Sequence, residues 1–482
     1  MSRRSKIVAT LGPSSSSREQ IAALIHAGMD VARLNFSHGS ADDHRERARV
    51  VREEAAKQGR FVALLGDLQG PKIRIARFAE NKIELAHGAA FRLSMSHDRA
   101  AGNAQVVGLD YPDLVKDCAP GDELLLDDGR IVLRVLAVDA DGVDTRVEVA
   151  GPLSNNKGIN KRGGGISAEA LTAKDRADIQ LAAELAVDYL AVSFPREAAD
   201  MQQARSLLEA AGGHAGLVAK IERAEAVAEL SVLEDLIRAS DAVMVARGDL
   251  GVEIGDAELI GIQKLIISRA RALNKGVITA TQMMESMTKS PMPTRAEVSD
   301  VANAVIDHTD AVMLSGETAA GDYPVEAVAA MARICIGAEK HAEQIPTAEA
   351  QVETFARCDQ TIALTAMYAA NHFPGVKAIV SLTESGATPL TMSRMRSQVP
   401  IFALSPHAST QHRVALYRGV YPIPFDINAH SREQANQAAV DELLKRGLVQ
   451  PGDWLVLTKG DYNNTEGGTN TLKIICAGDK VF

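Results

Sequence analysis

The sequence predicts an α/β protein built on a (β/α)₈ TIM barrel, with a small all-β domain inserted into the barrel and an α/β domain after it. Three observations lead to this prediction. Eight short apolar runs alternate with amphipathic helical segments over residues 1–343. Between residues 67 and 173 this alternation gives way to strands without a clear helix. After about residue 344, strands and helices alternate again as a separate unit.

The eight apolar runs are the expected barrel strands, and most end in a polar or glycine-bearing motif. They cover residues 6–12, 31–37, 61–67, 187–193, 217–222, 242–249, 277–282 and 311–317. Helices with one apolar face are expected at residues 18–27, 42–58, 173–186, 196–211, 225–239, 257–274, 297–307 and 324–343. Glycines stand where a helix-ending glycine belongs, at Gly28, Gly59, Gly212 and Gly276. Because spacing alone also fits a doubly wound open sheet, that fold is the alternative.

The interval after the third strand is expected to form the inserted domain. Strands are predicted there at residues 82–85, 123–126 and 131–138, and turns at Asp128-Gly129 and Asp141-Gly142. The C-terminal unit is expected to have strands at 378–382, 401–404, 454–458 and 471–476 and helices at 360–371, 389–396 and 432–446. The expected domains are residues 1–70 with 166–343 for the barrel, 71–165 for a lid over its top face, and 344–482 for a regulatory domain.

Composition argues against several classes of protein. Acidic residues outnumber basic ones by 62 to 52, a net charge of −10, which argues against general nucleic-acid binding. The N-terminal residues lack the apolar core of a signal peptide, and no apolar run approaches membrane-spanning length. The four scattered cysteines have no metal-site spacing and are expected to be reduced thiols. We therefore expect a cytoplasmic protein that does not associate with membranes.

Charged residues gather at the expected strand ends, where barrel enzymes place their active sites. Lys220 and Glu222 are two residues apart and therefore lie on the same side of a strand. Asp249 follows the next strand, and two carboxylates from adjacent strands suit Mg²⁺. A lysine beside them suits a migrating phosphoryl group, and Gly248 would let backbone N–H groups approach an anion. A solvated salt bridge between Lys220 and Glu222 is the alternative.

Further polar residues occupy the other strand ends. Arg33, Asn35 and Ser37 alternate with apolar residues and so share one face of their strand. An arginine aimed into a barrel favours a phosphate ligand, whereas the alternative is a half-exposed strand. Asp67 ends the third expected strand, and Thr281 lies at the end of the seventh. The Thr281 hydroxyl is either a proton relay or a structural hydrogen-bonding group.

Five cations flank the two connections to the inserted domain. They are Lys72 and Arg74 on the entry side and Lys157, Lys161 and Arg162 on the return. In a protein with a net negative charge, this cluster of cations indicates a site that binds a polyphosphate from several sides. A loop whose cations are merely solvated is the alternative. Neither a P-loop nor a dinucleotide-binding glycine motif is present. Nucleotide binding would therefore rest on the barrel top and the inserted domain.

Together these motifs resemble the pyruvate kinase family, bacterial type, over essentially the whole chain. The matching stretches are KIVATLGPS (6–14), VARLNFSHG (31–39), GDLQGPKIR (66–74), residues 157–163, AKIE (219–222), MVARGDLGVEI (244–254), ATQMMESM (280–287), PTRAE (293–297) and MLSGETA (313–319). Each is moderately specific, and their number and common order are not expected by chance. The resemblance implies transfer of the phosphoryl group of phosphoenolpyruvate to ADP, giving ATP and pyruvate.

The resemblance also implies a role for each matching residue. Glu222 and Asp249 would hold Mg²⁺ or Mn²⁺. Lys220 would neutralise charge on the phosphoryl group in flight, and Arg33 would hold the substrate phosphate.

The remaining implied roles concern the substrate carboxylate, the proton and the nucleotide. The backbone of Gly248 and Asp249 would bind the carboxylate, and Thr281 would lie near the proton delivery that makes pyruvate. Contacts to the nucleotide phosphates would come from Asn35, Phe36, Ser37, His38, Arg74 and Lys157.

One region departs from the family pattern. Family members usually form a monovalent-cation site from residues matching Asn35, Ser37, Asp67 and a following residue that is commonly threonine, but that residue here is Leu68. A glutamate of the K⁺-dependent members is replaced by Lys72. Because a tethered ammonium can supply the charge that K⁺ otherwise provides, we expect an enzyme that does not require K⁺.

The C-terminal unit carries a hydroxyl-rich segment, SLTESGAT at residues 381–388, which runs from a strand into a helix. Hydroxyl and N–H groups there suit an anion, and the resemblance implies a phosphorylated allosteric effector bound at Ser381, Thr383, Ser385, Gly386 and Thr388. Ordinary helix capping is the alternative. The family also implies a homotetramer. Two other functions remain open from the residues alone: a Mg²⁺-dependent barrel lyase or aldolase acting on a small oxo-acid, and a catalytically inactive binding protein.

Overall fold

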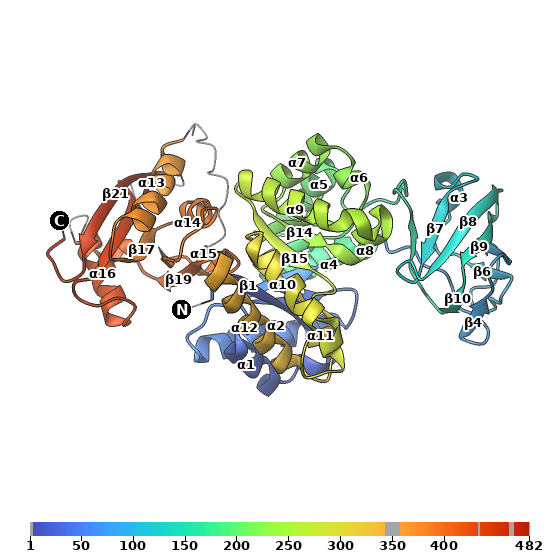
Figure 1. The fold of residues 1–482 in the computed structure, drawn as a ribbon, viewed down its shortest axis with the longest axis horizontal. Coiled ribbons are helices and arrows are strands. Elements are labelled where there is room, and N and C mark those ends of the chain that lie inside the picture. The colour runs from blue at the N-terminus through green and yellow to red at the C-terminus, as the bar shows by residue number, and fades with distance from the viewer. Residues whose placement is uncertain (1–2, 343–356, 432–433, 462–466, 482) are drawn as a thin grey trace.

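The computed structural model describes residues 3–342, 357–431, 434–461 and 467–481, and its centre is a closed barrel of parallel strands (Figure 1). Around the barrel the strands run in the order β1, β2, β3, β12, β13, β14, β15 and β16, and β16 pairs with β1. Their bounds are Lys6–Leu11, Val31–Asn35, Ala63–Asp67, Tyr189–Val192, Gly216–Ile221, Ala242–Ala246, Gly276–Ala280 and Ala311–Leu314. The predicted barrel is confirmed, and the open-sheet alternative is wrong.

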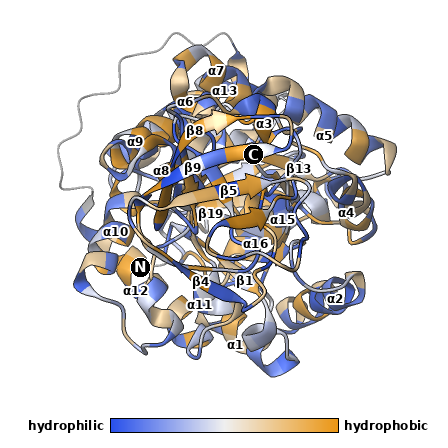
Figure 2. Ribbon diagram, turned by 90° about the vertical axis from the view of Figure 1, so that its right-hand side faces the viewer, coloured by the Kyte–Doolittle hydropathy of each residue, from blue (hydrophilic) through white to orange (hydrophobic). Residues whose placement is uncertain are grey.

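Helices surround the barrel and bury the outer faces of its strands. They are α1 (Arg18–Ala27), α2 (Ala41–Lys57), α4 (Ala173–Glu184), α5 (Ala198–Ala210), α6 (Glu225–Ala228), α7 (Leu230–Ala239), α8 (Arg247–Ile254), α9 (Asp256–Ala272), α10 (Arg295–Ile306), α11 (Gly316–Ala319) and α12 (Pro324–Ala342). Peripheral helices such as α2 and α5 mix hydrophobic and hydrophilic residues in Figure 2, as expected of elements with one buried side. Several begin at a hydroxyl side chain that accepts a backbone N–H, namely Ser17, Ser40, Thr172 and Thr294.

The interior of the barrel changes from apolar to polar along its axis. Side chains near the strand N-termini, including Val8, Val31, Leu65 and Tyr189, are buried in one apolar cluster with residues of the C-terminal domain. Because alternate strand residues face the same side, the next inward positions along these strands place polar side chains toward the strand C-termini. The candidate site therefore lies at the end of the barrel away from the C-terminal domain.

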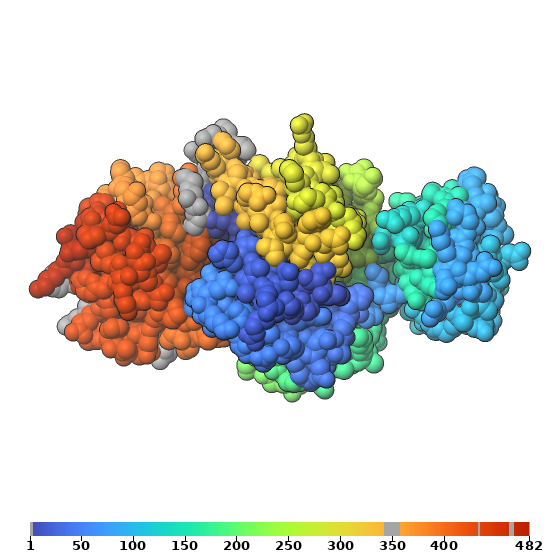
Figure 3. Space-filling view, turned by 90° about the horizontal axis from the view of Figure 1, so that it is seen from below, coloured from blue at the N-terminus to red at the C-terminus, as the bar shows by residue number. Residues whose placement is uncertain are grey.

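Between β3 and α4 the chain forms the inserted β domain, which Figure 3 shows as a separate lobe beside the barrel. Its main sheet has the strand order β11, β7, β8, β9, β5, β6, and β4 pairs separately with β10. The strands are β4 (Lys82–Leu85), β5 (Ala90–Ser94), β6 (Val106–Gly108), β7 (Glu123–Leu126), β8 (Ile131–Val138), β9 (Gly142–Val149), β10 (Gly151–Ser154) and β11 (Ile159–Lys161). The all-β prediction is confirmed apart from one short helix, α3 (Leu114–Asp117).

The C-terminal domain is an α/β unit with the sheet order β19, β18, β17, β20, β21. Its elements are α13 (Cys358–His372), β17 (Val376–Leu382), α14 (Ala387–Ser393), β18 (Ile401–Ser405), α15 (Ala408–Val414), β19 (Val420–Pro424), α16 (Ala435–Lys445), β20 (Trp454–Gly460) and β21 (Thr469–Cys476). It packs on the N-terminal end of the barrel, where Lys6 Nζ donates to the Val420 carbonyl at 2.6 Å and Tyr189 Oη to the Arg413 carbonyl at 2.7 Å.

Several predicted boundaries are corrected by the structure. The strands predicted at 242–249 and 311–317 end at Ala246 and Leu314, because α8 and α11 begin almost at once. The single helix predicted at 225–239 is two helices, separated by the extended residue Glu229. Helix α15, of seven residues, and strand β19, of five, were not predicted. Parts of the helices predicted at 324–343 and 432–446 lie outside the described residues.

One glycine prediction was also wrong. Gly28, Gly59 and Gly212 have positive φ angles of 124°, 63° and 77°, as a helix-ending glycine requires. Gly276 instead opens β15, and the left-handed residue after α9 is Asn274, with φ 55°.

The structure also shows whether any described helix could cross a membrane and what state the cysteines are in. None of the helices in the described ranges combines the length and apolarity that crossing a bilayer requires. All four cysteines lie in those ranges, and each is a free thiol.

Candidate active site

A layer of polar side chains closes the C-terminal end of the barrel. Its members come from neighbouring strands or the residues that directly follow them: Thr10, Arg33, Asp67, Ser193, Lys220 and Glu222. Five of them stand two residues after an inward apolar or small residue, and Glu222 stands two residues after Lys220, so the alternation of the strands brings all of them to the same place. The side chains of Arg33, Lys220 and Asp67 are only 11%, 12% and 1% exposed. The layer is thus a buried cluster of charges rather than a solvated salt bridge.

Asp67 lies between two cations. Its Oδ2 accepts a hydrogen bond from Arg33 Nε at 2.6 Å, and its Oδ1 lies 3.4 Å from Lys220 Nζ. Burial alone would raise the pKa of Asp67, but Arg33 and Lys220 outweigh it and hold that pKa below its usual value. Burial would likewise lower the pKa of Lys220, and the charges of Asp67 and Glu222 raise it instead. Both groups are therefore charged at neutral pH.

Hydroxyl groups orient these cations. Arg33 Nη1 donates to Thr10 Oγ1 at 2.9 Å, and Lys220 Nζ donates to Ser193 Oγ at 2.7 Å. Each hydroxyl in turn donates to a backbone carbonyl, that of Leu314 or Leu68, so both oxygens present a lone pair to the cation. Sequence reasoning did not single out Thr10 or Ser193, although both continue the two-residue alternation of their strands.

Glu222 and Asp249 meet at the ends of the adjacent strands β13 and β14. Glu222 Oε1 lies 2.9 Å from Lys220 Nζ, and Oε2 accepts the Phe194 N–H at 2.9 Å. Burial, together with the nearby charge of Asp249, raises the pKa of Glu222 to about 6, although Lys220 opposes this. Because two ionised carboxylates close together repel each other, a bound divalent cation would stabilise both in their ionised forms.

The donor set therefore fits a hard divalent ion. No group of three or more His, Cys, Asp and Glu side chains in the described ranges is arranged to hold a metal. Two carboxylates are nevertheless enough for Mg²⁺, which commonly keeps waters and takes further oxygens from a substrate.

Thr281 and Gly248 face each other at the next two strand ends. Thr281 Oγ1 accepts the Gly248 N–H at 2.8 Å and donates to the Ala280 carbonyl at 2.8 Å. Thr281 has φ 62°, in the left-handed region that β-branched residues rarely adopt. Backbone strain of this kind is common at functional positions, and the two hydrogen bonds of the hydroxyl equally fit a structural role.

The residues of the expected monovalent-cation site also come together. Asn35 Oδ1 accepts the Ser37 N–H at 3.1 Å, and the buried Oδ1 of Asp67 has no hydrogen-bond partner. Leu68 is 1% exposed and offers no side-chain oxygen. The side chain of Lys72 is exposed, and no described residue forms a hydrogen bond or ion pair with it. Lys72 lines a cleft between the inserted β domain and the barrel, together with Phe194 and Asp249.

The predicted cluster of five cations is only partly available for a ligand. Lys157, Lys161 and Arg162 pair with carboxylates of the inserted β domain, for example Lys157 Nζ with Asp127 Oδ1 at 2.6 Å. These pairs hold the return strand to its own domain. Lys72 and Arg74, on the entry side, have no ion pair among the described residues.

Two of the expected nucleotide contacts differ in their exposure. The Phe36 side chain is 2% exposed and packs edge-on against His44 in the core, so only its backbone can face a ligand. Its carbonyl already accepts a hydrogen bond from Lys174 Nζ at 2.7 Å. The His38 side chain is exposed at the end of the same segment.

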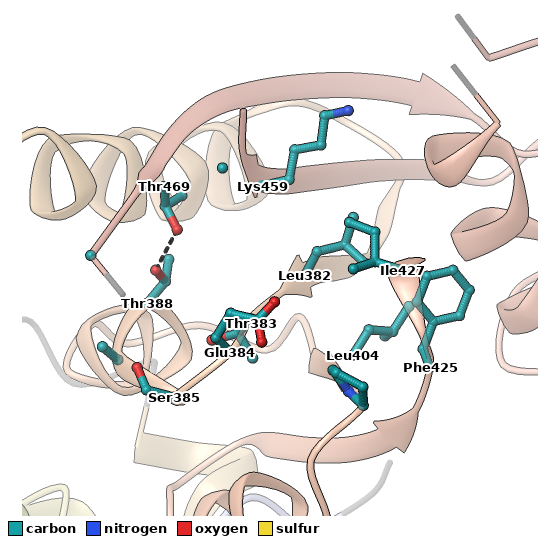
Figure 4. Close-up of a pocket in the computed structure, with 14 residues that line it drawn as sticks. Leu382, Thr383, Glu384, Ser385, Thr388, Leu404, Phe425, Ile427, Lys459 and Thr469 are labelled. Atoms are coloured by element: carbon teal, nitrogen blue, oxygen red, sulfur yellow. Dashed lines mark hydrogen bonds between the residues drawn. The ribbon is translucent and has the colours of Figure 1, made fainter. Parts of the chain in front are cut away.

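The hydroxyl-rich segment of the C-terminal domain borders a pocket (Figure 4). The pocket is lined by Thr383, Glu384, Ser385 and Thr388 from this segment and by Lys459 and Thr469 from β20 and β21, among others. Thr388 and Thr469 share a hydrogen bond of 2.8 Å across it. Ser381 is completely buried and Gly386 turns the chain with φ 84°, so neither of these two predicted residues lines the pocket.

Comparisons with known proteins agree with this arrangement. Residues 2–328 match the pyruvate kinase barrel domain, and residues 360–475 match the pyruvate kinase alpha/beta domain. The chain is 57% identical over 474 residues to pyruvate kinase II of Salmonella typhimurium, with 98% of each chain covered. It is 55% identical over 474 residues to pyruvate kinase of Haemophilus influenzae, again with 98% of each chain covered. It is 43% identical over 482 residues to that of Geobacillus stearothermophilus, covering 98% of this chain and 80% of the relative. From these matches and the closed barrel with its C-terminal α/β domain, the chain belongs to the pyruvate kinase family.

Proposed function

We propose that the polar layer at the barrel's C-terminal end transfers the phosphoryl group of phosphoenolpyruvate to ADP, giving ATP and pyruvate. The observation that carries this proposal is the pair of buried cations, Arg33 and Lys220, set beside the carboxylates of Glu222 and Asp249 at adjacent strand ends. Transfer of a phosphoryl group depends on fixed positive charge and correct positioning, and this site offers both.

Arg33 and Lys220 would bind the phosphoryl group. Asp67 and Thr10 hold Nε and Nη1 of Arg33, so Nη2 can point toward a phosphate oxygen. The Lys220 ammonium would lie beside the phosphoryl group during its transfer and neutralise its charge. Glu222 and Asp249 would hold Mg²⁺ or Mn²⁺, and when bound this ion supplies positive charge that offsets the charge on phosphoryl and enolate oxygens.

Gly248 and Thr281 would contact the part of the substrate that carries the carboxylate and the enolate. The first N–H groups of α8, including those of Gly248 and Asp249, suit the substrate carboxylate. Thr281 then lies beside the enolate that phosphoryl transfer leaves behind, where its hydroxyl can pass on the proton that completes pyruvate. The nucleotide phosphates would lie against Arg74, Lys157, His38 and the turn that includes Asn35, the Phe36 backbone and Ser37.

One coupled assay tests this function. The purified protein should form pyruvate and ATP from phosphoenolpyruvate, ADP and Mg²⁺, and Lys220→Met should lower kcat at least about a thousandfold through loss of the charge at the transferred group. Lys57→Met, which removes an exposed lysine at the C-terminal end of α2, is the control and should retain most of the activity. A lyase or aldolase would consume an oxo-acid without ATP formation, and an inactive binding protein would form neither product.

The same site is proposed to work without K⁺. The Leu68 side chain supplies no oxygen for a monovalent cation. The ammonium of Lys72 has no ion pair among the described residues, and Lys72 lines the same cleft as Asp249. Activity should change less than about twofold when KCl is added to a K⁺-free buffer, whereas Lys72→Glu should create a requirement for K⁺. Strong activation of the parent enzyme by KCl would contradict this.

The remaining expectations concern regulation and organisation. The pocket in Figure 4 is proposed to bind a phosphorylated effector through hydroxyl and amide groups of residues 383–388. We retain a cytoplasmic homotetramer as the working form, with residues 1–70 and 166–343 as the catalytic barrel, 71–165 as its lid and 344–482 as the regulatory domain. Binding of sugar phosphates and nucleotides by calorimetry, and molar mass by light scattering, test these points.

A further inference from the structure

A buried arginine beside the candidate site, Arg247, takes no part in the roles described above. It directly follows β14, and only 4% of it is exposed. Its Nη1 contacts both carboxylate oxygens of Asp300, at 2.7 Å each. Asp300 belongs to α10, 53 residues further along the chain. Hydrogen bonds between a guanidinium and a carboxylate are among the strongest in proteins, so this contact ties the end of β14 firmly to α10.

The other guanidinium nitrogens hold the main chain at Thr281. Nη2 donates to the Thr281 carbonyl at 2.7 Å, and Nε lies 3.2 Å from the carbonyls of both Ala280 and Thr281. Thr281 and Gln282 both have positive φ angles, 62° and 52°. Two successive non-glycine residues in the left-handed region need surrounding contacts to keep them there. Arg247 supplies three of these contacts, and Asp300 fixes Arg247.

We propose that Arg247 and Asp300 are a positioning pair that fixes the Thr281 main chain, so that the Thr281 hydroxyl faces Gly248 and the substrate. This inference rests on the proposed function, in which Thr281 takes part in protonating the enolate. The hydroxyl accepts the Gly248 N–H, the same group proposed to bind the substrate carboxylate. A bound carboxylate would therefore compete for that N–H and release the hydroxyl. With the main chain held by Arg247, the hydroxyl needs only to turn about χ1.

The step concerned is the last one of the reaction. The π electron pair of the enolate forms a C–H bond at the methylene carbon, and the charge on oxygen re-forms the carbonyl of pyruvate. The Thr281 hydroxyl passes on the proton and takes another from water. The pair is thus expected to affect this proton transfer more than the binding of phosphoenolpyruvate, whose phosphate is held by other residues.

Two measurements separate these effects. The first is steady-state kinetics with phosphoenolpyruvate and ADP. The second is exchange of the pyruvate methyl protons with D₂O, followed by NMR in the presence of Mg²⁺ and inorganic phosphate. Asp300→Asn is expected to lower both kcat and the exchange rate about tenfold or more, with the KM for phosphoenolpyruvate within about twofold.

Asp307→Asn is the matched control. Asp307 directly follows α10 and pairs with Lys264 of α9 at 2.6 Å, but it does not contact Thr281 or Arg247. This variant should keep the parent rates. Asp300→Glu, which can still bind the guanidinium, should recover part of the loss. Arg247→Lys keeps the charge but cannot hold Asp300 and the Thr281 carbonyl at once, so it should resemble Asp300→Asn, and it serves as the second test if Asp300→Asn fails to fold.

A double-mutant cycle decides whether the pair acts through Thr281. In a Thr281→Ala background, Asp300→Asn should change the exchange rate less than about twofold. Equal effects of Asp300→Asn in both backgrounds, or equal effects of Asp300→Asn and Asp307→Asn in the parent, would overturn the inference. A parent protein that forms no pyruvate from phosphoenolpyruvate and ADP would instead reject the proposed function, so the two failures are distinguishable.

Discussion

Replacing Glu253 by glutamine tests how the inserted β domain is anchored to the barrel. Glu253 lies on α8 and is 2% exposed. Its Oε2 accepts the Ala224 N–H at 2.8 Å, and its backbone carbonyl accepts the N–H of Gly163, where the chain returns from the inserted β domain. Arg223 Nε is 3.9 Å away, too far for a hydrogen bond. Burial, only partly offset by Arg223, raises the pKa of Glu253 to about 7.

The raised pKa of Glu253 determines how the stability of the protein changes with pH. The folded state favours the protonated carboxyl, whereas the unfolded chain ionises it near the usual value of 4.5. The free energy of unfolding therefore falls as the pH rises from 4.5 through about 7. At 1.36 kcal/mol per pKa unit, the fall approaches about 3 kcal/mol. Glutamine stays neutral at every pH. Relative to the parent, the variant should gain about 2.5 kcal/mol between pH 5 and pH 8, or about 5 °C in the midpoint of barrel unfolding.

Scanning calorimetry at pH 5, 6.5 and 8 measures this change. Glu258→Gln is the control, because Glu258 is an exposed residue of α9 and its replacement should leave the pH dependence unchanged. Parallel pH curves for the parent and Glu253→Gln would refute the reasoning, since they would mean that Glu253 is already ionised in the folded protein at pH 5.

Three further substitutions test other contacts. Asp67→Asn removes the carboxylate between the buried cations Arg33 and Lys220, so kcat/KM for phosphoenolpyruvate should fall at least about a hundredfold in steady-state assays. Gly164→Ala places a Cβ 2.4 Å from Glu225 Oε2 at a residue with φ 81°, which should loosen the return connection and speed limited proteolysis there without changing the circular dichroism. Asp310→Asn breaks a fully buried ion pair with Arg394 between the barrel and the C-terminal domain, which should cost about 3–5 kcal/mol and lower the thermal midpoint.

Much of the fold could be predicted because strand alternation is a local property of the chain. Arg33 and Asp67 point into the barrel because Val31 and Leu65, two residues earlier, occupy its apolar interior. The ends of elements were less predictable. The strand predicted at 242–249 ends at Ala246, where the chain turns directly into α8 and Arg247 binds Asp300 and the Thr281 carbonyl. That contact depends on how two distant segments pack, and the local pattern of residues does not reveal it.

In the site, too, strand alternation predicts some contacts, whereas others depend on how distant segments pack. Lys220 and Glu222 share a strand, so their spacing alone brings them together, and their 2.9 Å contact follows. The five cations near the inserted β domain could be counted in the sequence, but their pairing could not. Lys157, Lys161 and Arg162 are neutralised by carboxylates of their own domain, which leaves Lys72 and Arg74 as the cations without ion pairs on the entry side, among the residues the structure describes. Positive charge available to a substrate is thus concentrated at the barrel's end and at one connection. A ligand that contacts both Arg33 and Lys72 would therefore link the polar layer to the entry connection of the inserted β domain.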